Sequence, residues 1–389
     1  MRTGALGLLA VLALGACTPA AAPKPAASTR PTAAASASPT PASTSTPTLK
    51  PAGALNLSLA TVATGLVAPW AIDFAKDASV WLTERDGRVR VIRDGQLLPA
   101  AALTLSVVSS PGCESGLLGI ALHEPNAFLY YTYRGPAGNT NRVSRFTISG
   151  NTLSGEQVIL DGIPGGTCYH FGGRLKFGPD GLLYVTTGEG YVASRAADFN
   201  NLNGKILRLR EDGSGREVFA WGFRNPQGIA FDPQGRLYAS NHGPTGDLLP
   251  CCHDEVDLVQ QGAFYGWPAW AAGTRTPYAQ GSLPNRTGPM AESGTDTWAP
   301  SGMTFFAPSK DEQPTLIVSE LRGQALRRFV VDAADPTRVT SQEITLQGQG
   351  RLRDAVAGPD GCLYTLTTNR DGRGSPGPSD DRVLKLCPA

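Results

Sequence analysis

The chain has 389 residues, and its 34 Lys and Arg residues nearly balance its 33 Asp and Glu residues, for a formal net charge of +1. Without a long basic stripe, this balance argues against nucleic acid or an anionic membrane surface as an electrostatic partner. The length allows one large domain or two smaller ones.

The first 17 residues are typical of an export signal. Arg2 supplies the positive start, Leu6 to Leu14 form the apolar core, and the sequence LGAC ends at Cys17. The apolar run is too short to span a bilayer. LGAC resembles the lipobox of bacterial lipoproteins, in which the Cys carries the lipid. We therefore expect an exported, membrane-tethered protein, periplasmic or on the cell surface; the alternative is a plain secretory signal with an incidental Cys.

Residues 18–54 consist almost wholly of Ala, Pro, Ser and Thr. This composition cannot bury a core and predicts a disordered tether. The predicted organisation is a signal peptide at 1–17, a tether at 18–54 and a catalytic domain at 55–389.

Cysteines in an exported protein indicate disulfides before metal ligands. Without Cys17, six remain, and six allow fifteen pairings. We favour Cys362 with Cys387, because both fall in the last repeat, and Cys113 with Cys168, because each directly precedes a site motif. Cys251 and Cys252 are then left to form a vicinal ring.

From Leu55 onward the chain repeats an apolar strand, a turn with Gly or Asp, and a β-rich run that usually ends in a small or hydroxyl residue. Six copies align on Thr83, Thr132, Thr186, Ser240, Ser319 and Leu366. A period near fifty residues with four short strands predicts an all-β, six-bladed β-propeller with four-stranded blades. A β-sandwich pair, the alternative, predicts no such spacing. The final strand, DRVLKLCPA, is expected to close the ring against residues 55–62.

The interval between Ser240 and Ser319 is the longest, so this unit carries a loop insertion. Long loops in compact domains are usually functional. In a propeller, loops on one face converge on the axis, so residues remote in sequence can share one pocket.

One candidate proton acceptor is His170, in the stretch CYHFGGRLKFGPDG, because glycines beside it allow close approach of a ligand. A hydrogen-bonded structural histidine is the alternative. Arginines also occur in several corresponding loops, namely Arg224, Arg322, Arg351 and Arg353. Taken singly, each is more simply a solvated surface charge. Together in one pocket they would repel one another, and they therefore predict a polyanionic ligand.

The chain resembles the soluble quinoprotein sugar dehydrogenases, the glucose/sorbosone dehydrogenase group. The stretches that carry the resemblance follow the family order: LVAPWAIDF, ESGLLGIALH, HFGGRLKFGPDG, NGKILRL, GFRNPQGIAF, HGP with DEVDL and YGWP, APSGM, and RLRD. The resemblance implies a six-bladed propeller that binds pyrroloquinoline quinone (PQQ), a tricarboxylate, over a calcium ion in the axial cleft.

The resemblance also implies roles for single residues. His170 matches the base that takes the proton of the anomeric hydroxyl, and Arg224 matches the residue that stabilises negative charge on the reduced quinone. Gly243 and Pro244 match the carbonyl ligands of the quinone-bound calcium. The remaining matches are Glu255 and Tyr265 to a second, structural calcium, Asn225, Thr297, Arg351 and Arg353 to cofactor contacts, and Glu114 to a substrate contact that is Gln in the best-studied members.

The chain departs from the family pattern at three places. Arg322 stands where a cofactor-pairing Lys is usual, and Tyr169 stands where a carboxylate often precedes the base. The insertion TGDLLPCCH puts Cys251 and Cys252 near the expected cleft mouth, either as a wall of the site or as a surface turn. These departures leave the sugar that is oxidised open.

Three functions remain. The first is an aldose dehydrogenase that uses PQQ and Ca²⁺, oxidises an aldose sugar and passes electrons to an unidentified external acceptor. The second is a calcium-dependent lactonase, which needs carboxylates and an Asn around an axial ion and has no use for Arg351 and Arg353. The third is a carbohydrate- or protein-binding propeller without catalysis, for which His170 is coincidental.

Overall fold

The structure is a computed structural model that describes residues 49–245, 251–271, 274–276 and 283–389. The predicted export signal, Cys17 and most of the tether lie outside the described residues, as does the middle of the TGDLLPCCH insertion. No helix in the described ranges is long and apolar enough to cross a membrane. Leu49–Ala389 forms one unit, to which the rest of this description refers.

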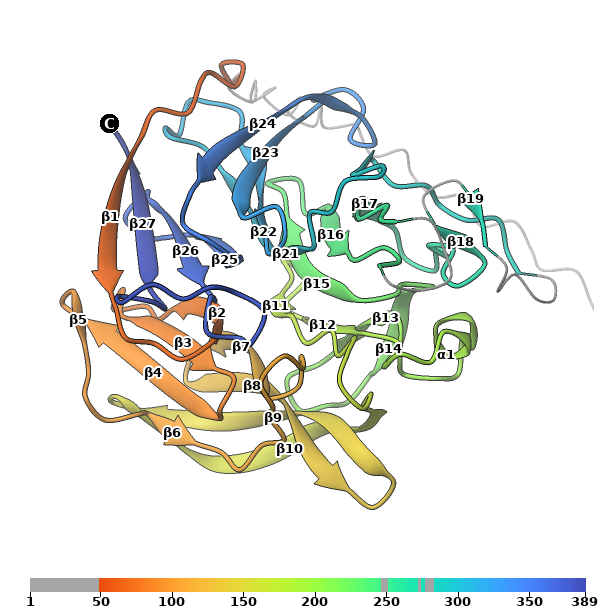
Figure 1. Ribbon diagram of the computed structural model, residues 1–389, viewed down its shortest axis with the longest axis horizontal. Helices are drawn as coiled ribbons and strands as arrows, with labels where there is room; N and C mark the ends of the chain where they lie inside the picture. Colours follow the sequence, from red (N-terminus) through yellow and green to blue (C-terminus); the bar gives the residue numbers. More distant parts are fainter. Residues whose placement is uncertain (1–48, 246–250, 272–273, 277–282) are drawn as a thin grey trace, which may run out of the picture. The chain divides into compact units, whose positions relative to one another are not determined.

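Six antiparallel sheets are arranged around a common axis, which confirms the predicted six-bladed β-propeller (Figure 1). In blades 1 to 3 the strands are β2 (Pro69–Phe74), β3 (Val80–Glu84), β4 (Arg88–Arg93), β5 (Gln96–Leu97) and β6 (Leu103–Thr104); β7 (Leu117–His123), β8 (Asn126–Gly135), β9 (Gly138–Ser149) and β10 (Thr152–Pro164); and β11 (Leu175–Phe177), β12 (Leu183–Thr187), β13 (Lys205–Leu209) and β14 (Glu217–Trp221).

In blades 4 to 6 they are β15 (Pro226–Phe231), β16 (Leu237–Asn241), β17 (Glu255–Val259) and β20 (Ala291–Glu292); β21 (Pro300–Phe306), β22 (Thr315–Glu320), β23 (Ala325–Val331) and β24 (Val339–Gln347); and β25 (Leu352–Ala357), β26 (Leu363–Thr367), β27 (Val383–Pro388) and β1 (Leu57–Ala63). The long fourth unit, where a loop insertion was predicted, also carries a hairpin of β18 (Trp270–Ala271) and β19 (Thr274–Arg275). A single short helix, α1 (Ser194–Ala197), is present in the described part of the chain.

The ring closes by pairing the two ends of the described unit. Strand β1 lies antiparallel to β27, with Leu57 opposite Pro388 and Thr61 opposite Leu384. The predicted closure is therefore confirmed. Because blade 6 contains both ends, it cannot form before the whole chain is present.

The repeated hydroxyl residue has a structural cause. It lies in the second strand of its blade, where its Oγ atom bonds to the innermost strand of the same or the next blade. Thr83 donates to the Leu118 carbonyl at 2.5 Å, Ser240 to the Ser301 carbonyl at 2.7 Å, and Ser319 to the Gly302 carbonyl at 2.8 Å. The first two bonds join the second strand of one blade to the inner strand of the next, and the third joins two strands of one blade.

The second strands β3, β12, β16 and β26 are buried along their whole length. Both faces of a blade pack against neighbouring blades, so these strands lack the alternation of buried and exposed residues that a half-exposed strand shows. Trp70, Trp81, Tyr130 and Tyr238 are among the largest fully buried side chains. Burial of each such side chain contributes roughly 1.5 to 3 kcal/mol, which makes the ring a rigid frame for loops.

Candidate functional site

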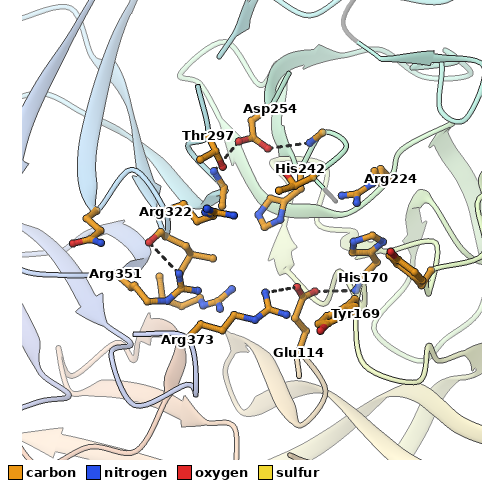
Figure 2. A pocket seen from close by; sticks show the side chains of 17 residues that line it. Glu114, Tyr169, His170, Arg224, His242, Asp254, Thr297, Arg322, Arg351 and Arg373 are labelled. Atoms are coloured by element: carbon orange, nitrogen blue, oxygen red, sulfur yellow. Dashed lines mark hydrogen bonds and ion pairs between the residues drawn. The ribbon is translucent and has the colours of Figure 1, made fainter. Parts of the chain in front are cut away.

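A cavity of about 730 Å³ opens on one face of the propeller (Figure 2). Because strands within a blade alternate in direction, the connections after second and fourth strands leave from the same face, and these connections supply the lining. The lining residues are Glu114, Tyr169, His170, Tyr191, Arg224, His242, Gly243, Thr245, Asp254, Thr297, Ala299, Leu321, Arg322, Gln324, Arg351, Arg353 and Arg373.

His170 lies at the edge of this cavity and is 6% exposed. Its backbone has a φ of +63°, a left-handed conformation that is uncommon for a residue other than glycine and that often marks a functional site. The ring Nδ1 lies 2.5 Å from Oε1 of Glu189. Since a carboxylate only accepts, Nδ1 carries the proton and Nε2 is left as the basic nitrogen. Glu189, which follows β12, therefore fixes the tautomer of His170.

Glu114 joins the His170 loop to two neighbouring loops. Its Oε2 accepts hydrogen bonds from the backbone N–H of His170 at 2.8 Å and from Nδ2 of Asn225 at 3.2 Å. Its Oε1 accepts from Arg373 at 3.2 Å. Burial alone would raise the pKa of Glu114, but the imidazoles of His170 and His242, the Arg373 guanidinium and the hydrogen bond from the His170 N–H together lower it to about 2. Glu114 is thus a carboxylate over the whole physiological range.

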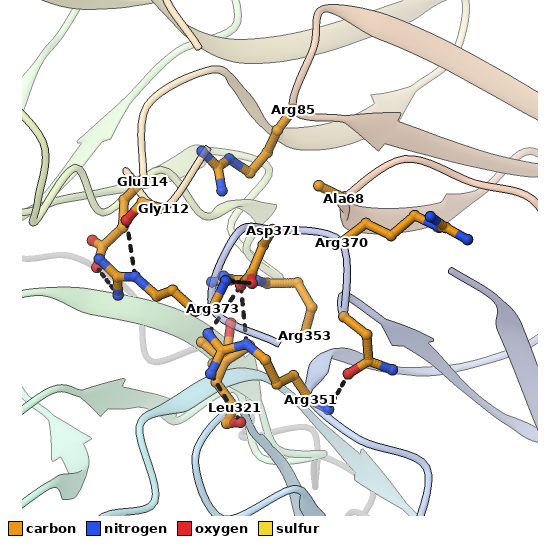
Figure 3. A network of polar contacts seen from close by, with 12 residues as sticks. Ala68, Arg85, Gly112, Glu114, Leu321, Arg351, Arg353, Arg370, Asp371 and Arg373 are labelled. Carbon is orange, nitrogen blue, oxygen red and sulfur yellow. Dashed lines mark hydrogen bonds and ion pairs between the residues drawn. The ribbon is translucent and has the colours of Figure 1, made fainter. Parts of the chain in front are cut away.

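Two of the predicted arginines share one carboxylate, Asp371 (Figure 3). Arg351 donates to Oδ2 of Asp371 through Nε at 3.0 Å and through Nη2 at 2.9 Å. Arg353 lies 3.9 Å from the same oxygen and donates to Oε1 of Gln227 at 2.7 Å. Burial lowers the pKa of Arg353 to about 9, against the opposing effect of Asp371. The fold therefore supplies part of the counter-charge.

The cavity nevertheless carries an excess of positive charge, since five arginines and two carboxylates line it. Two of its buried polar atoms, Oγ1 of Thr297 and Nε of Arg353, have no hydrogen-bond partner among the described residues. A buried polar atom without a partner is costly unless a ligand or water satisfies it. This donor set fits an anionic ligand with several carboxylates.

Gly243 also lines the cavity and is positioned by Asp254. Oδ1 of Asp254 accepts from the Gly243 N–H at 3.0 Å, and Oδ2 accepts from Trp298 and Ala299 at 2.8 Å each. A side chain at Gly243 would collide with the Cys252 carbonyl, 1.9 Å from an added Cβ, so only glycine fits. Asp254 thereby holds together two loops of the cavity wall. Burial raises the pKa of Asp254 to about 6.

Two further acidic residues lie away from the cavity, in β17. Glu255 and Asp257 are two residues apart in a strand and so face the same side. Glu255 accepts from Nδ2 of Asn241 at 2.9 Å, whereas neither carboxylate oxygen of Asp257 has a hydrogen-bond partner among the residues the structure covers. Burial and the neighbouring Glu255 raise the pKa of Asp257 well above its usual value. Such a pair fits a cation.

The side chain of Tyr265, the other predicted ligand of the second calcium, is already hydrogen-bonded to the backbone. Its hydroxyl donates to the Leu258 carbonyl at 2.7 Å and accepts from the Gln260 N–H at 2.9 Å. A metal contact from Tyr265 would therefore have to use its backbone carbonyl. In the described ranges no group of three or more His, Cys, Asp and Glu side chains could hold a metal.

Eight of the predicted site residues line the cavity together: Glu114, His170, Arg224, Gly243, Thr297, Arg322, Arg351 and Arg353. The other four do not line it: Asn225 lies behind Glu114, Pro244 follows Gly243, and Glu255 and Tyr265 belong to the second acidic site. Arg224 is buried, with its guanidinium 5.5 Å from the Trp267 ring centre.

Sequence reasoning missed Glu189, His242, Asp371 and Arg373. His242 lines the cavity and donates through Nε2 to the Pro300 carbonyl at 2.8 Å. Burial lowers the pKa of His242 to about 3, although Glu114 opposes this, so its ring is neutral and Nδ1 is an acceptor. The sequence gives one signal for these four residues: they fall in connections on the same face of the propeller as the predicted site residues. No motif marks them individually.

The three preferred disulfides are all present, as Cys113–Cys168, Cys251–Cys252 and Cys362–Cys387. The first joins the loop of Glu114 to the loop of His170, and the Glu114 N–H donates to the Cys168 carbonyl at 2.7 Å. Neither Cys251 nor Cys252 lines the cavity, and Cys252 is fully buried behind Gly243.

Comparison with known proteins identifies the family of the chain. The family model for glucose/sorbosone dehydrogenase matches residues 66–375. The aldose sugar dehydrogenase of Escherichia coli is 30% identical over 336 residues, which cover 78% of this chain and 88% of that protein. The PQQ-bound form of aldose sugar dehydrogenase from Streptomyces coelicolor superposes with a TM-score of 0.71 at 31% identity, covering 86% and 99% of the two chains. The chain therefore belongs to the glucose/sorbosone dehydrogenase family.

Proposed function

We propose that this protein is a quinoprotein oxidoreductase that oxidises the anomeric carbon of aldose sugars to lactones with PQQ and Ca²⁺. The observation that carries the proposal is the buried His170–Glu189 pair at the edge of a cavity with five arginines. A base and an anion site side by side are what hydride abstraction from a sugar by a carboxylated cofactor requires.

The cavity fits the cofactor through its donors. Arg322, Arg351, Arg353 and Thr297 would hold the three carboxylates, and the unpartnered atoms of Thr297 and Arg353 favour this assignment. Asn225 supports the same wall through Glu114. When bound, the quinone supplies the hydride acceptor. Arg224 would stabilise negative charge as it develops there.

His170 would act at Nε2. With Nδ1–H held by Glu189, Nε2 is the nitrogen able to accept the proton of the anomeric hydroxyl while the hydride leaves the same carbon. Glu189 would stabilise the imidazolium that results. Glu114, ionised and fixed by three hydrogen bonds, is placed to accept from a sugar hydroxyl as well as to support the His170 backbone.

Two places would hold calcium in this proposal. Backbone carbonyls of Gly243 and Pro244 would bind an ion next to the quinone, in keeping with the preference of Ca²⁺ for hard oxygen ligands. Glu255, with the unpartnered carboxylate of Asp257 beside it and the Tyr265 carbonyl, would bind a second, structural ion. The predicted export signal and Cys17 support a catalytic domain tethered outside the cytoplasmic membrane, where an external acceptor would remove the electrons.

One reconstitution experiment separates this function from the two alternatives. Purified apoprotein receives PQQ and Ca²⁺, and reduction of a redox dye is followed with an aldose as donor. Dye reduction that requires both additions supports the proposal. Ester hydrolysis without PQQ supports a lactonase, and neither activity supports a binding propeller.

The variant His170→Ala tests whether His170 is the general base. We expect PQQ affinity to change little and turnover to fall by about 10² to 10⁴-fold, because a positioned general base is lost. Near-normal turnover in this variant would remove His170 from the mechanism.

A further inference from the structure

Two tyrosines stand at the mouth of the cavity with their rings exposed. Tyr169 is 37% exposed and Tyr191 is 50% exposed, and both belong to the lining. Large aromatic side chains gain stability mainly by burial. Each residue keeps between a third and a half of its surface in solvent, so core packing alone does not account for the two tyrosines.

The two rings form a continuous aromatic surface next to the base. Their centres lie 5.8 Å apart in an edge-to-face arrangement. The Tyr191 ring centre is 5.2 Å from the imidazole of His170, and the Tyr169 ring centre is 6.4 Å from it. A sugar whose anomeric carbon lies at His170 would therefore reach the two tyrosine rings.

The backbone holds Tyr191 in an unfavourable conformation. Its φ is +60°, which is rare and unfavourable for an aromatic residue. The loop that enforces it also holds the base, since the Gly190 N–H donates to the His170 carbonyl at 2.9 Å and the Val192 N–H donates to the Glu189 carbonyl at 3.3 Å. The position of Tyr191 is thereby fixed relative to His170.

Polar groups border the same surface. The Arg373 guanidinium lies 4.8 Å from the Tyr169 ring centre and 3.2 Å from Glu114. In Figure 2, Tyr169 and His170 lie on one side of the cavity and Arg322 and Arg351 on the opposite side. Arg322 and Arg351 thus form one wall of the cavity, suited to the anionic cofactor, whereas the tyrosine wall also contains Arg224, Arg373 and Glu114.

We propose that Tyr169 and Tyr191 form a pyranose subsite on which the apolar C–H face of the aldose packs while the anomeric carbon meets His170. A pyranose has an apolar C–H face and a polar rim. The face suits an aromatic ring through dispersion and burial, and Glu114 and Arg373 suit hydroxyls of the rim. This inference rests on the proposed function. It assigns the specificity of the proposed dehydrogenase for cyclic sugars to the side chains of Tyr169 and Tyr191.

The kinetic test uses PQQ- and Ca²⁺-loaded protein with glucose. We expect Tyr191→Ala to raise KM about tenfold or more, the scale of one lost aromatic contact, with kcat within about threefold, and Tyr169→Ala to act in the same direction. Tyr191→Phe keeps the ring and should stay within about twofold of wild type in KM. Phe199→Ala, which removes an exposed aromatic ring outside the cavity, is the control. An unchanged KM in Tyr191→Ala would overturn the subsite.

A binding test does not depend on turnover. Methyl β-glucopyranoside has the ring but no free anomeric hydroxyl, so the loaded enzyme cannot oxidise it. Saturation-transfer NMR should show transfer from aromatic protein protons to the ring C–H protons of this probe, and Tyr191→Ala should lose it. Transfer that persists in this variant would contradict the proposal. If the wild-type protein binds the glucoside in this way but oxidises no aldose, the result contradicts the proposed function and still supports the subsite.

Discussion

Replacement of Glu189 by Gln tests whether the carboxylate behind His170 contributes to turnover. The two side chains are 2.5 Å apart and only 7% and 3% exposed, so solvent screens their interaction little. Gln keeps the volume and offers an amide oxygen to Nδ1–H, but it removes the negative charge. A hydrogen bond to a charged group contributes about 1.5 to 3 kcal/mol, and each 1.36 kcal/mol is tenfold in rate. We therefore expect kcat to fall by about 10- to 160-fold.

The assay is steady-state dye reduction by the loaded enzyme, with PQQ affinity measured separately by titration. The affinity should not change, because Glu189 does not line the cavity. Glu217→Gln is the matched control, since it removes a carboxylate from the same blade that pairs with Arg208 at the surface. If Glu189→Gln keeps kcat within twofold of wild type, the orienting role of this carboxylate is refuted.

Three further predictions concern binding and stability. Arg351→Ala should weaken PQQ binding by about 1.5 to 3 kcal/mol, and unchanged titrations would contradict this. Loss of the Cys113–Cys168 disulfide by double Ser substitution should lower the free energy of unfolding in guanidinium by about 4 kcal/mol, the chain-entropy value for a separation of 55 residues; a loss below about 1 kcal/mol would argue against that account. Ca²⁺ should raise the melting temperature, and Asp257→Asn should abolish most of that rise; an equal rise in both proteins would exclude Asp257 as a ligand.

The fold could be predicted because it repeats. The hydroxyl residues Thr83, Ser240 and Ser319 recur for the same reason, since each donates to an inner-strand carbonyl, so their spacing follows the blades. The last copy lacks the hydroxyl at Leu366, where Thr367 instead donates to Asp380 at 3.2 Å. Ring closure by β1 and β27 could be predicted because a propeller pairs the two ends of its chain in one blade.

The partners within the site could not be predicted in the same way. Glu189 meets His170 because the connection after β12 folds back over the loop that precedes β11, and Asp371 reaches Arg351 from the next connection of blade 6. These contacts depend on the paths of the loops across the face of the propeller. Local sequence patterns do not predict those paths. The arginines were predicted to need an external anion, whereas the fold itself supplies Asp371 and Glu114 as part of their counter-charge.

This internal counter-charge explains how so basic a cavity can exist without a bound anion. A buried guanidinium without a partner would cost several kcal/mol, and Arg351 and Arg353 lie close enough to share one carboxylate oxygen. Asp371 removes most of that cost during folding. Oγ1 of Thr297 and Nε of Arg353 remain unsatisfied within the described structure, and they are the atoms from which an entering carboxylate would gain most. Folding and cofactor loading are thereby separated, so an apoprotein purified without quinone should be folded and ready for reconstitution.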